Sequence, residues 1–188
     1  MKRFLIAVSL LALSGFVVCA DNIGENYEGG GTVFGGSGYI YLSLNGYWSV
    51  SVDPWVDFLL ADGIAVGLGL DTYMNSNGEW GDSLHPSVSF AFGYDPDATS
   101  GPAHRVGLRS GVGFGGTSFS DVSLDFGWIE PYYTFYYFIT PRIAPYAQLT
   151  AVTLDFVGGI TLDTYVWLGF GIAFHMPNKD RVMGGTPK

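Results

Sequence analysis

Bulky apolar residues occupy every second position along most of the chain after residue 38. Between Ile64 and Asp71 they alternate with Ala, Gly, Gly and Asp. The segment from Val166 to Phe174 repeats the pattern, with Trp and small residues at the intervening positions. A period of two residues is typical of β-strands, because successive side chains point to opposite faces. The chain is therefore predicted to be all-β.

Turn-forming residues divide this pattern into eight segments. The predicted strands cover residues 39–44, 47–60, 64–74, 84–94, 105–115, 122–139, 142–154 and 160–174. Asn45-Gly46 and Asp62-Gly63 are strong hairpin signals, and the alternation of faces favours a three-residue loop at both places. The connection 95–104 is predicted to be longer than the other connections at its end of the strands.

The two faces of the predicted strands differ in an unusual way. One face is bulky and apolar, whereas the other is mostly small, with occasional charge. A soluble sheet would place many charged residues on its second face, because that face meets water. In a lipid-embedded barrel the bulky face meets hydrocarbon and the small face lines a narrow interior. Only a closed barrel leaves no unpaired strand edge in lipid. The sequence thus predicts an eight-stranded antiparallel up-and-down transmembrane β-barrel.

The sixth predicted strand changes phase along its length. The residues predicted to face outward before the change are Val122, Leu124, Phe126 and Trp128, and those after it are Tyr133, Phe135 and Tyr137. A change of face within one strand predicts a β-bulge, which we place between Ile129 and Pro131. Four tyrosines are predicted to belong to an aromatic girdle at the membrane interface: Tyr132, Tyr133, Tyr136 and Tyr137. An aromatic core strand of a soluble protein is the alternative.

The start of the chain has the features of a secretory leader. A short basic start precedes an almost wholly apolar run from Phe4 to Val18, and small residues follow up to Ala20. The run is shorter than the roughly 20 residues of a membrane-spanning helix, so cleavage after Ala20 is expected. An uncleaved anchor and lipid attachment at Cys19 are the alternatives. We predict a signal peptide at 1–20, a flexible Gly-rich acidic lead-in at 21–37, a barrel at 38–175 and a tail at 176–188.

Composition and charge agree with a chain that exposes few ionic groups. Charged residues make up 13% of the sequence, against about 25% in a typical soluble domain. Cleavage would remove two of the eight basic residues and none of the 17 acidic ones, which changes the net charge from -9 to -11. Nucleic acid is excluded as a partner, because phosphate binding needs a basic face. Cleavage also removes the single cysteine, so no disulfide is predicted.

Two segments resemble a known family. Residues 51–68, with Asp53-Pro54-Trp55 followed by Ala61-Asp62-Gly63, resemble the second hairpin of the small bacterial outer-membrane β-barrels often described as the porin family. Residues 130–137 resemble the later Pro-aromatic strand of that family, although Thr134 stands where Arg is usual. The resemblance implies the outer membrane of a Gram-negative cell envelope, with lipid and lipopolysaccharide as surroundings.

The resemblance also implies how the chain reaches its membrane. The last strand is similar to the terminal signal that the barrel-insertion machinery reads, and the residues that would carry it are Val166, Leu168, Phe170, Ile172 and Phe174. Periplasmic chaperones and this machinery are the implied partners, and a monomer is expected. The chain departs from the family pattern because a tail, His175 to Lys188, follows the signal.

The chemical candidates are ionisable residues on the inward face. Arg109 is the only basic residue predicted to lie well inside the barrel, and an unpaired guanidinium there would be costly. We predict that it bonds a lumen acid, the candidates being Asp125, Asp71, Asp163 and Glu130. An eight-stranded barrel is just wide enough to be filled by side chains. The predicted role is therefore structural or interactive, without a large-conductance pore.

Two motifs suggest chemistry but lack the context that it needs. His85-Pro86-Ser87 resembles a fragment of an outer-membrane lipid deacylase site, yet both side chains are predicted to face the lumen. The polar loop from Asn75 to Asp82 lacks the first and twelfth acids of a calcium loop. No enzymatic activity, metal or cofactor is therefore predicted. A lipid-modifying enzyme of the outer membrane and a secreted soluble barrel that binds an apolar ligand are the alternatives.

Overall fold

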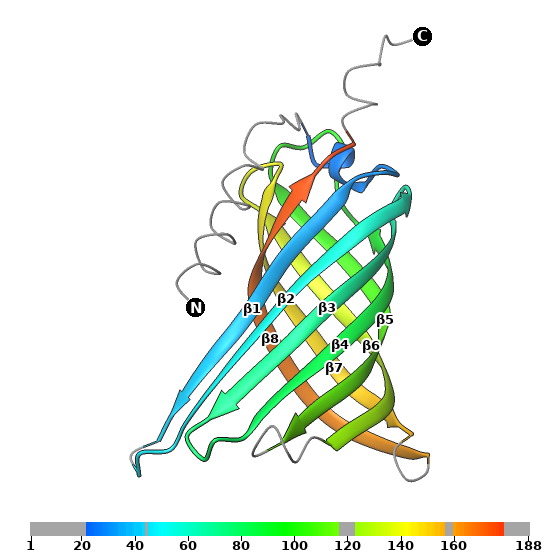
Figure 1. The fold of residues 1–188 in the computed structure, drawn as a ribbon. Helices are drawn as coiled ribbons and strands as arrows, with labels where there is room; N and C mark the ends of the chain where they lie inside the picture. The colour runs from blue at the N-terminus through cyan, green and yellow to red at the C-terminus, as the bar shows by residue number, and fades with distance from the viewer. Residues whose placement is uncertain (1–21, 44, 117–122, 157–159, 179–188) are drawn as a thin grey trace.

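The chain folds into one closed antiparallel barrel, seen in the computed structural model in Figure 1. The structure describes residues 22–43, 45–116, 123–156 and 160–178, with backbone alone at 39, 41, 112, 114–116, 123–126 and 165. Each strand pairs with its neighbours in the chain, and the first pairs with the last. The strands are β1 (Thr32–Leu42), β2 (Trp48–Ala61), β3 (Ile64–Asn75), β4 (Trp80–Phe92), β5 (Gly101–Gly116), β6 (Ser123–Phe138), β7 (Ile143–Asp155) and β8 (Thr161–Met176). The all-β, eight-stranded prediction is confirmed.

Apolar side chains cover the outside of the barrel and polar ones lie within it. Leu68 on β3 is 47% exposed, whereas its neighbours on the other face, such as Ala65, are buried. The exposed set includes Ile64, Val66, Leu70, Leu84, Val88, Phe90, Val106, Leu108, Val166, Leu168, Phe170 and Ile172. The predicted sidedness of these strands is confirmed. No helix among the described residues is long and apolar enough to cross a membrane.

The first strand begins earlier than predicted, which corrects the boundary at 38. Residues 32–37 belong to β1, where they pair with β2 on one side and with β8 on the other. The residues before them form a short 3-10 helix, η2 (Gly24–Tyr27). The predicted flexible lead-in at 21–37 is thus wrong over its described part, because this segment packs into the barrel. Glycines and small residues fit there because other backbones approach closely: a Cβ on Gly35 would lie 2.8 Å from the carbonyl oxygen of Ile172.

The two predicted hairpins close in different ways. In the first, the Ser43 amide donates to the carbonyl of Tyr47 at 2.8 Å, and Gly46 has a φ of 87°. This arrangement leaves the predicted three-residue loop between them. In the second, Ala61 pairs directly with Ile64, so the turn has two residues and the prediction is wrong. A register shift between Leu59 and Ala61 keeps the alternation of faces instead.

The phase change in β6 lies earlier than predicted. Gly127 has a φ of 90°, and the register against β5 shifts at this point. Trp128 consequently lines the lumen, which corrects its predicted outward position. A second shift, against β7, falls between Ile129 and Tyr132, where the bulge was predicted. Tyr132 and Tyr136 are buried, so only the other two tyrosines of the predicted girdle face outward.

One end of the barrel is plugged by the N-terminal segment (Figure 1). We call this the plugged end; it carries the β2–β3, β4–β5 and β6–β7 connections. The amide of Ile23 donates to the carbonyl of Ala98 at 2.8 Å, and the Gly63 amide donates to the carbonyl of Tyr27 at 2.7 Å. Asn26 Nδ2 donates to the carbonyl of Pro141. The segment therefore bonds all three connections. The β4–β5 connection spans 93–100, shorter than the predicted 95–104.

The seam between β1 and β8 is shorter than the other seams. Only Thr32–Ser37 pair with Gly171–Met176, six residues on each strand. On its other side, β1 pairs with β2 along its full length, from Thr32 to Leu42. Beyond Ser37 the two strands diverge toward the opposite end, which we call the open end (Figure 1).

Candidate functional site: the polar lumen

The lumen next to the plug contains a buried ion pair. Arg105 on β5 bonds Asp57 on β2, and both side chains are almost fully buried. The guanidinium carbon lies 5.6 Å from the ring centres of both Trp55 and Tyr136. Aromatic faces stabilise a desolvated cation, and a buried charge needs a partner of opposite sign. This arrangement fills the lumen at that level.

A second ion pair lies closer to the open end. Arg109 bonds Glu130, which is directly opposite on β6 in the strand register. The Thr153 hydroxyl donates to the other carboxylate oxygen of Glu130 at 3.0 Å. Glu130 is one of the acids predicted to bond Arg109. The side chain of Asp125 lies outside the described residues, and Asp71 accepts a bond from the Ser51 hydroxyl at 2.8 Å.

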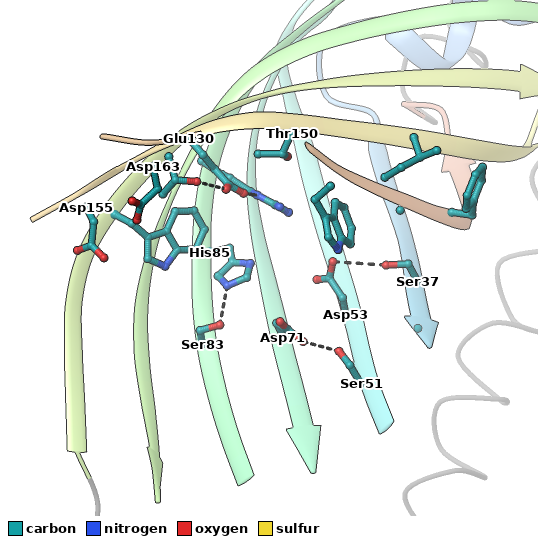
Figure 2. Close-up of a pocket in the computed structure, with 18 residues that line it drawn as sticks. Ser37, Ser51, Asp53, Asp71, Ser83, His85, Glu130, Thr150, Asp155 and Asp163 are labelled. Atoms are coloured by element: carbon teal, nitrogen blue, oxygen red, sulfur yellow. Dashed lines mark hydrogen bonds and ion pairs between the residues drawn. The ribbon is translucent and has the colours of Figure 1, made fainter. Parts of the chain in front are cut away.

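Beyond the second ion pair the lumen widens into a cavity of about 810 Å³. Figure 2 shows its side chains pointing inward from most strands of the barrel. Five carboxyl groups line it, against one guanidinium, that of Arg109. The carboxyl groups belong to Asp53, Asp71, Glu130, Asp155 and Asp163. The predicted side-chain-filled lumen thus holds only in the half nearer the plug, and the other half is hollow and acidic.

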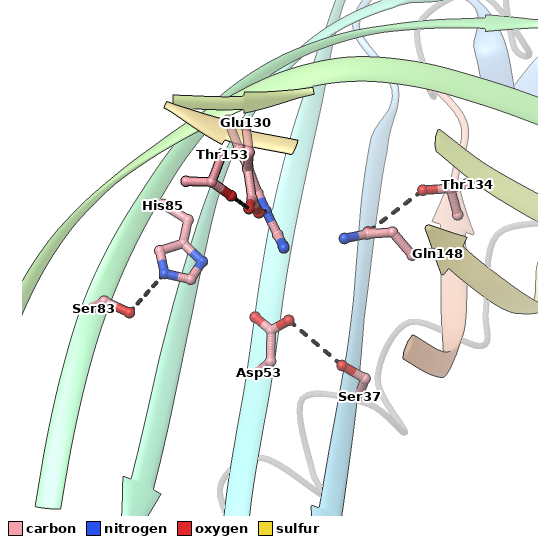
Figure 3. Close-up of polar contacts among 9 residues, drawn as sticks. Ser37, Asp53, Ser83, His85, Glu130, Thr134, Gln148 and Thr153 are labelled. Atoms are coloured by element: carbon pink, nitrogen blue, oxygen red, sulfur yellow. Dashed lines mark hydrogen bonds and ion pairs between the residues drawn. The ribbon is translucent and has the colours of Figure 1, made fainter. Parts of the chain in front are cut away.

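Two polar atoms in this cavity have no hydrogen-bond partner among the described residues. His85 Nε2 bonds the Ser83 hydroxyl at 2.7 Å, but its Nδ1 is unpaired, and the side chain is 7% exposed (Figure 3). The Thr150 hydroxyl is likewise unpaired, at 1% exposure. Buried polar groups are normally hydrogen-bonded. Either atom would gain a hydrogen bond if a small side-chain movement brought it into contact with a ligand.

The lumen does not continue as a wide channel toward the plugged end. Between the two arginines the free space shrinks to about 40 Å³. Further on, Tyr27 from η2 stacks on Tyr94 at 4.5 Å and meets His175 and Phe138 edge-on. Burial raises the pKa of Tyr27 above its usual range, so this phenol stays neutral. The cavity is accordingly closed on its inner side.

The structure shows the surroundings of His85 and of the polar loop from Asn75 to Asp82. His85 faces the lumen as predicted, beside Trp128, whose ring centre is 5.0 Å away. Asn75 closes the polar loop on itself by bonding Glu79 and the amide of Asn77. Within the described part of the chain, no group of three or more His, Cys, Asp or Glu side chains is arranged to hold a metal ion.

Sequence reasoning missed one of the two lumen arginines. Arg105 stood at the first residue of a predicted strand and so outside the lumen, whereas β5 begins four residues earlier, at Gly101. Its parity with Arg109 was the available signal. Of the terminal-strand residues, Val166, Leu168, Phe170 and Ile172 face outward. The fifth, Phe174, is half-buried and stacks on Phe34 of β1 at 5.3 Å.

Comparison with known proteins relates the fold to solved barrels. No family model and no curated protein sequence matches the chain. The N-terminal β-barrel domain of OprF from Pseudomonas aeruginosa aligns with a TM-score of 0.53 at 13% identity, covering 79% of this chain and 98% of that one. Neisserial surface protein A aligns at 0.48 and 12% identity, covering 78% and 95%. The likeness to the OprF domain shows a shared eight-stranded barrel fold.

Proposed function

We propose that the chain is an integral β-barrel of the bacterial outer membrane, anchored in lipid, with a structural or interaction role. The observation that carries this proposal is the reversed burial pattern. Among the side chains that the structure describes, thirty large hydrophobic ones are exposed, including Leu168 at 55%, while Arg105 and Asp57 are buried inside. In water this would expose a continuous apolar surface far larger than soluble proteins tolerate. In a bilayer the same surface faces hydrocarbon.

The fold shared with the OprF domain supports an outer-membrane location. Lipid and lipopolysaccharide would then surround the barrel, and periplasmic chaperones and the barrel-insertion machinery would deliver it. The exposed apolar residues of β8, from Val166 to Ile172, are the surface that such machinery would read. We further propose that the barrel acts as a monomer.

The interior supports a barrel without a large-conductance pore. The path from the open end narrows to about 40 Å³ between the two arginines and then meets the plug at Tyr27. Side chains occupy most of the lumen at both levels, which supports the absence of a wide water-filled channel. Planar-bilayer recordings of the purified chain should therefore show no large, stable open steps.

Heat-modifiability on a gel tests the membrane assignment. Purified outer membranes from cells that express the full chain are loaded with and without boiling. A folded barrel keeps its shape in dodecyl sulfate and migrates differently from the boiled chain. Recovery of a monomer from plain buffer without detergent would overturn the proposal and favour a secreted soluble barrel.

The enzyme alternative receives no support from the site. His85 bonds Ser83 rather than Ser87, so the predicted pair is not assembled. A positioned base and nucleophile are required for acyl hydrolysis. We propose no catalytic role for this pair.

A further inference from the structure

The barrel wall is incomplete between β1 and β8 in the half nearer the open end. Pairing stops at Ser37 and Gly171, although both strands continue, β1 to Leu42 and β8 back to Thr161. On the other side of β8, pairing with β7 extends from Phe174 to Thr161. In Figure 1, β1 and β8 run apart toward the open end.

The lumen cavity lies beside the unpaired part of this seam. Its lining includes Arg109 and Glu130, which point inward, and also Leu168 and Phe170, which point outward from β8. Gly38 and Phe170, which would form the next pair after Ser37 and Gly171, both line the cavity at the point where pairing stops. The edge toward β7 is paired, at Leu149–Leu168 for example. The opening therefore lies at the edge toward β1, where Gly38 also lines the cavity.

The surroundings of the opening are apolar and very exposed. Ile40 on β1 is 71% exposed and Val166 on β8 is 79% exposed. Unpaired backbone groups are costly in hydrocarbon, and irregular backbone is tolerated at membrane depth where it lines a polar cavity. A membrane barrel with this shape gives a molecule in the bilayer a lateral route to the lumen.

We propose that the cavity binds a cationic amphiphile, which enters from the bilayer between β1 and β8. This proposal rests on the membrane location proposed above. The five carboxyl groups against one guanidinium in the cavity favour a positively charged head group. The unpaired Thr150 hydroxyl and His85 Nδ1 are two further groups that a bound ligand would satisfy after a small side-chain movement. The chain of the amphiphile lies in the opening against Leu168 and Phe170.

Asp53 is the carboxyl group best placed to hold the head group near the opening. It lies on β2, and its Oδ2 is 3.5 Å from the hydroxyl of Ser37, the last paired residue of β1. Asp163 on β8 lines the cavity from the opposite strand. Asp53 would hold a primary amine beside the last paired residues, and Asp163, which lies further toward the open end, adds to the negative charge of the cavity.

Binding is tested with dodecylamine on the refolded full chain in phosphatidylcholine nanodiscs, read by native mass spectrometry as a saturable one-to-one adduct. Butylamine carries the head group without the chain, and dodecanoate carries the chain with the opposite charge. We expect a dodecylamine adduct and neither of the others. Equal binding of dodecanoate would show that the site does not require a cationic head group. Equal binding of butylamine would show that it does not require an alkyl chain.

Two variants and a matched control locate the site. Asp53→Asn should weaken dodecylamine binding by about tenfold, the usual effect of losing one charge-assisted hydrogen bond. Asp163→Asn should weaken it less, because it removes only one negative charge from the cavity. Asp82→Asn removes a carboxyl group on β4 that does not line the cavity, and it should leave binding unchanged. Equal weakening by all three would mean that the bulk charge of the chain attracts the amine, which contradicts the site.

A reversible closure tests the route. Continuing the β1–β8 register places Ile40 opposite Leu168. A reducible bis-methanethiosulfonate crosslinker between Ile40→Cys and Leu168→Cys would tie the two strands across the opening, which is too wide for a direct disulfide. Binding should be lost after crosslinking and return on reduction. Binding that survives closure, or a second copy of the chain found crosslinked at this edge, overturns lateral entry. If the chain is a heat-modifiable barrel but forms no adduct with dodecylamine, the proposed ligand is wrong and the proposed membrane function stands. If the chain never enters membranes, the proposed function itself is wrong.

Discussion

Arg105 and Asp57 bond each other across the barrel, linking β5 to β2 rather than to a strand beside it. The second ion pair differs, because Arg109 and Glu130 face each other on adjacent strands. A cross-lumen bond fixes the distance between opposite walls. It also sets the level at which the hollow part of the lumen ends, since the narrow space of about 40 Å³ lies between the two arginines.

Breaking the cross-lumen pair should destabilise the barrel strongly. Asp57→Asn leaves the buried Arg105 guanidinium without its counter-charge, which costs about 3–5 kcal/mol for comparable buried pairs. Adding Arg105→Gln to Asp57→Asn removes the stranded charge, so the double variant should lose less than the two single variants together. Urea unfolding in lipid measures all three. Strictly additive losses would show that the two side chains do not interact.

Two inward glycines on β3 should respond differently to a methyl group. A Cβ on Gly67 would lie 1.7 Å from Asp57 Oδ1 and 2.6 Å from Ser87 Oγ. On Gly69 the nearest atom would be the His85 Cβ, at an ordinary 3.5 Å. Overpacking of a filled interior costs about 1–3 kcal/mol, so Gly67→Ala should be destabilised by this amount and Gly69→Ala much less. Comparable unfolding midpoints for the two would argue against the filled level near Asp57.

The outward face is tested by placing a charge on it. Leu68 lies near the middle of β3 and is 47% exposed. Leu68→Arg should cost about 2–4 kcal/mol in a bilayer, where the guanidinium faces hydrocarbon. Asn77→Arg, in the exposed β3–β4 turn, is the control and should change stability little. If both arginines are tolerated equally in refolding titrations, the face is not buried in lipid.

The plug depends on the ring of Tyr27 rather than on its hydroxyl. The ring is buried against Tyr94, Phe138 and His175, whereas the hydroxyl has no hydrogen-bond partner among the described residues. Tyr27→Phe should therefore be neutral or stabilising, and Tyr27→Ala should lose about 3–5 kcal/mol. Thermal unfolding of the refolded barrels provides the comparison.

Alkaline pH should separate wild type from Tyr27→Phe. Burial raises the pKa of Tyr27 above its usual value, so the folded chain holds this proton more tightly than the unfolded chain does. The associated stability is complete below the unfolded pKa of about 10 and falls as the pH rises above it. Wild type should lose more stability than Tyr27→Phe between about pH 9 and 11. Parallel curves would show that Tyr27 ionises freely.

Alternation alone was enough to predict the barrel and its sidedness. From Ile64 to Leu70 each side chain faces either the outside of the barrel or the lumen. The size and polarity of the side chain are enough to tell which of the two it faces. The incorrect predictions lie where a bulge or a glycine shifts the alternation of faces, while the residue types along the strand stay the same. Gly127 shifts the register so that Trp128 turns inward, and a large aromatic fits either face.

The site was predicted less well than the fold, because it depends on contacts between distant residues. The partner of Arg109 was narrowed to four acids, since parity cannot choose among inward carboxyl groups. Arg105 was missed because a strand end was placed four residues too late. The plug was missed because glycine-rich sequence before a strand resembles a linker, and only the folded barrel end supplies the pocket for Ile23 and Tyr27.

The short β1–β8 seam has a consequence for the order of folding. It joins residues at the two extremes of the barrel, Thr32 with Met176, so it carries the largest chain-closure entropy of any pairing and should form last. The six residue pairs of this seam contribute little free energy to offset the entropy lost when the barrel closes. The contacts of η2 with the β2–β3, β4–β5 and β6–β7 connections hold the start of β1 at the same end of the barrel. Loss of the N-terminal segment should therefore slow barrel closure more than it changes the pairing of the finished strands.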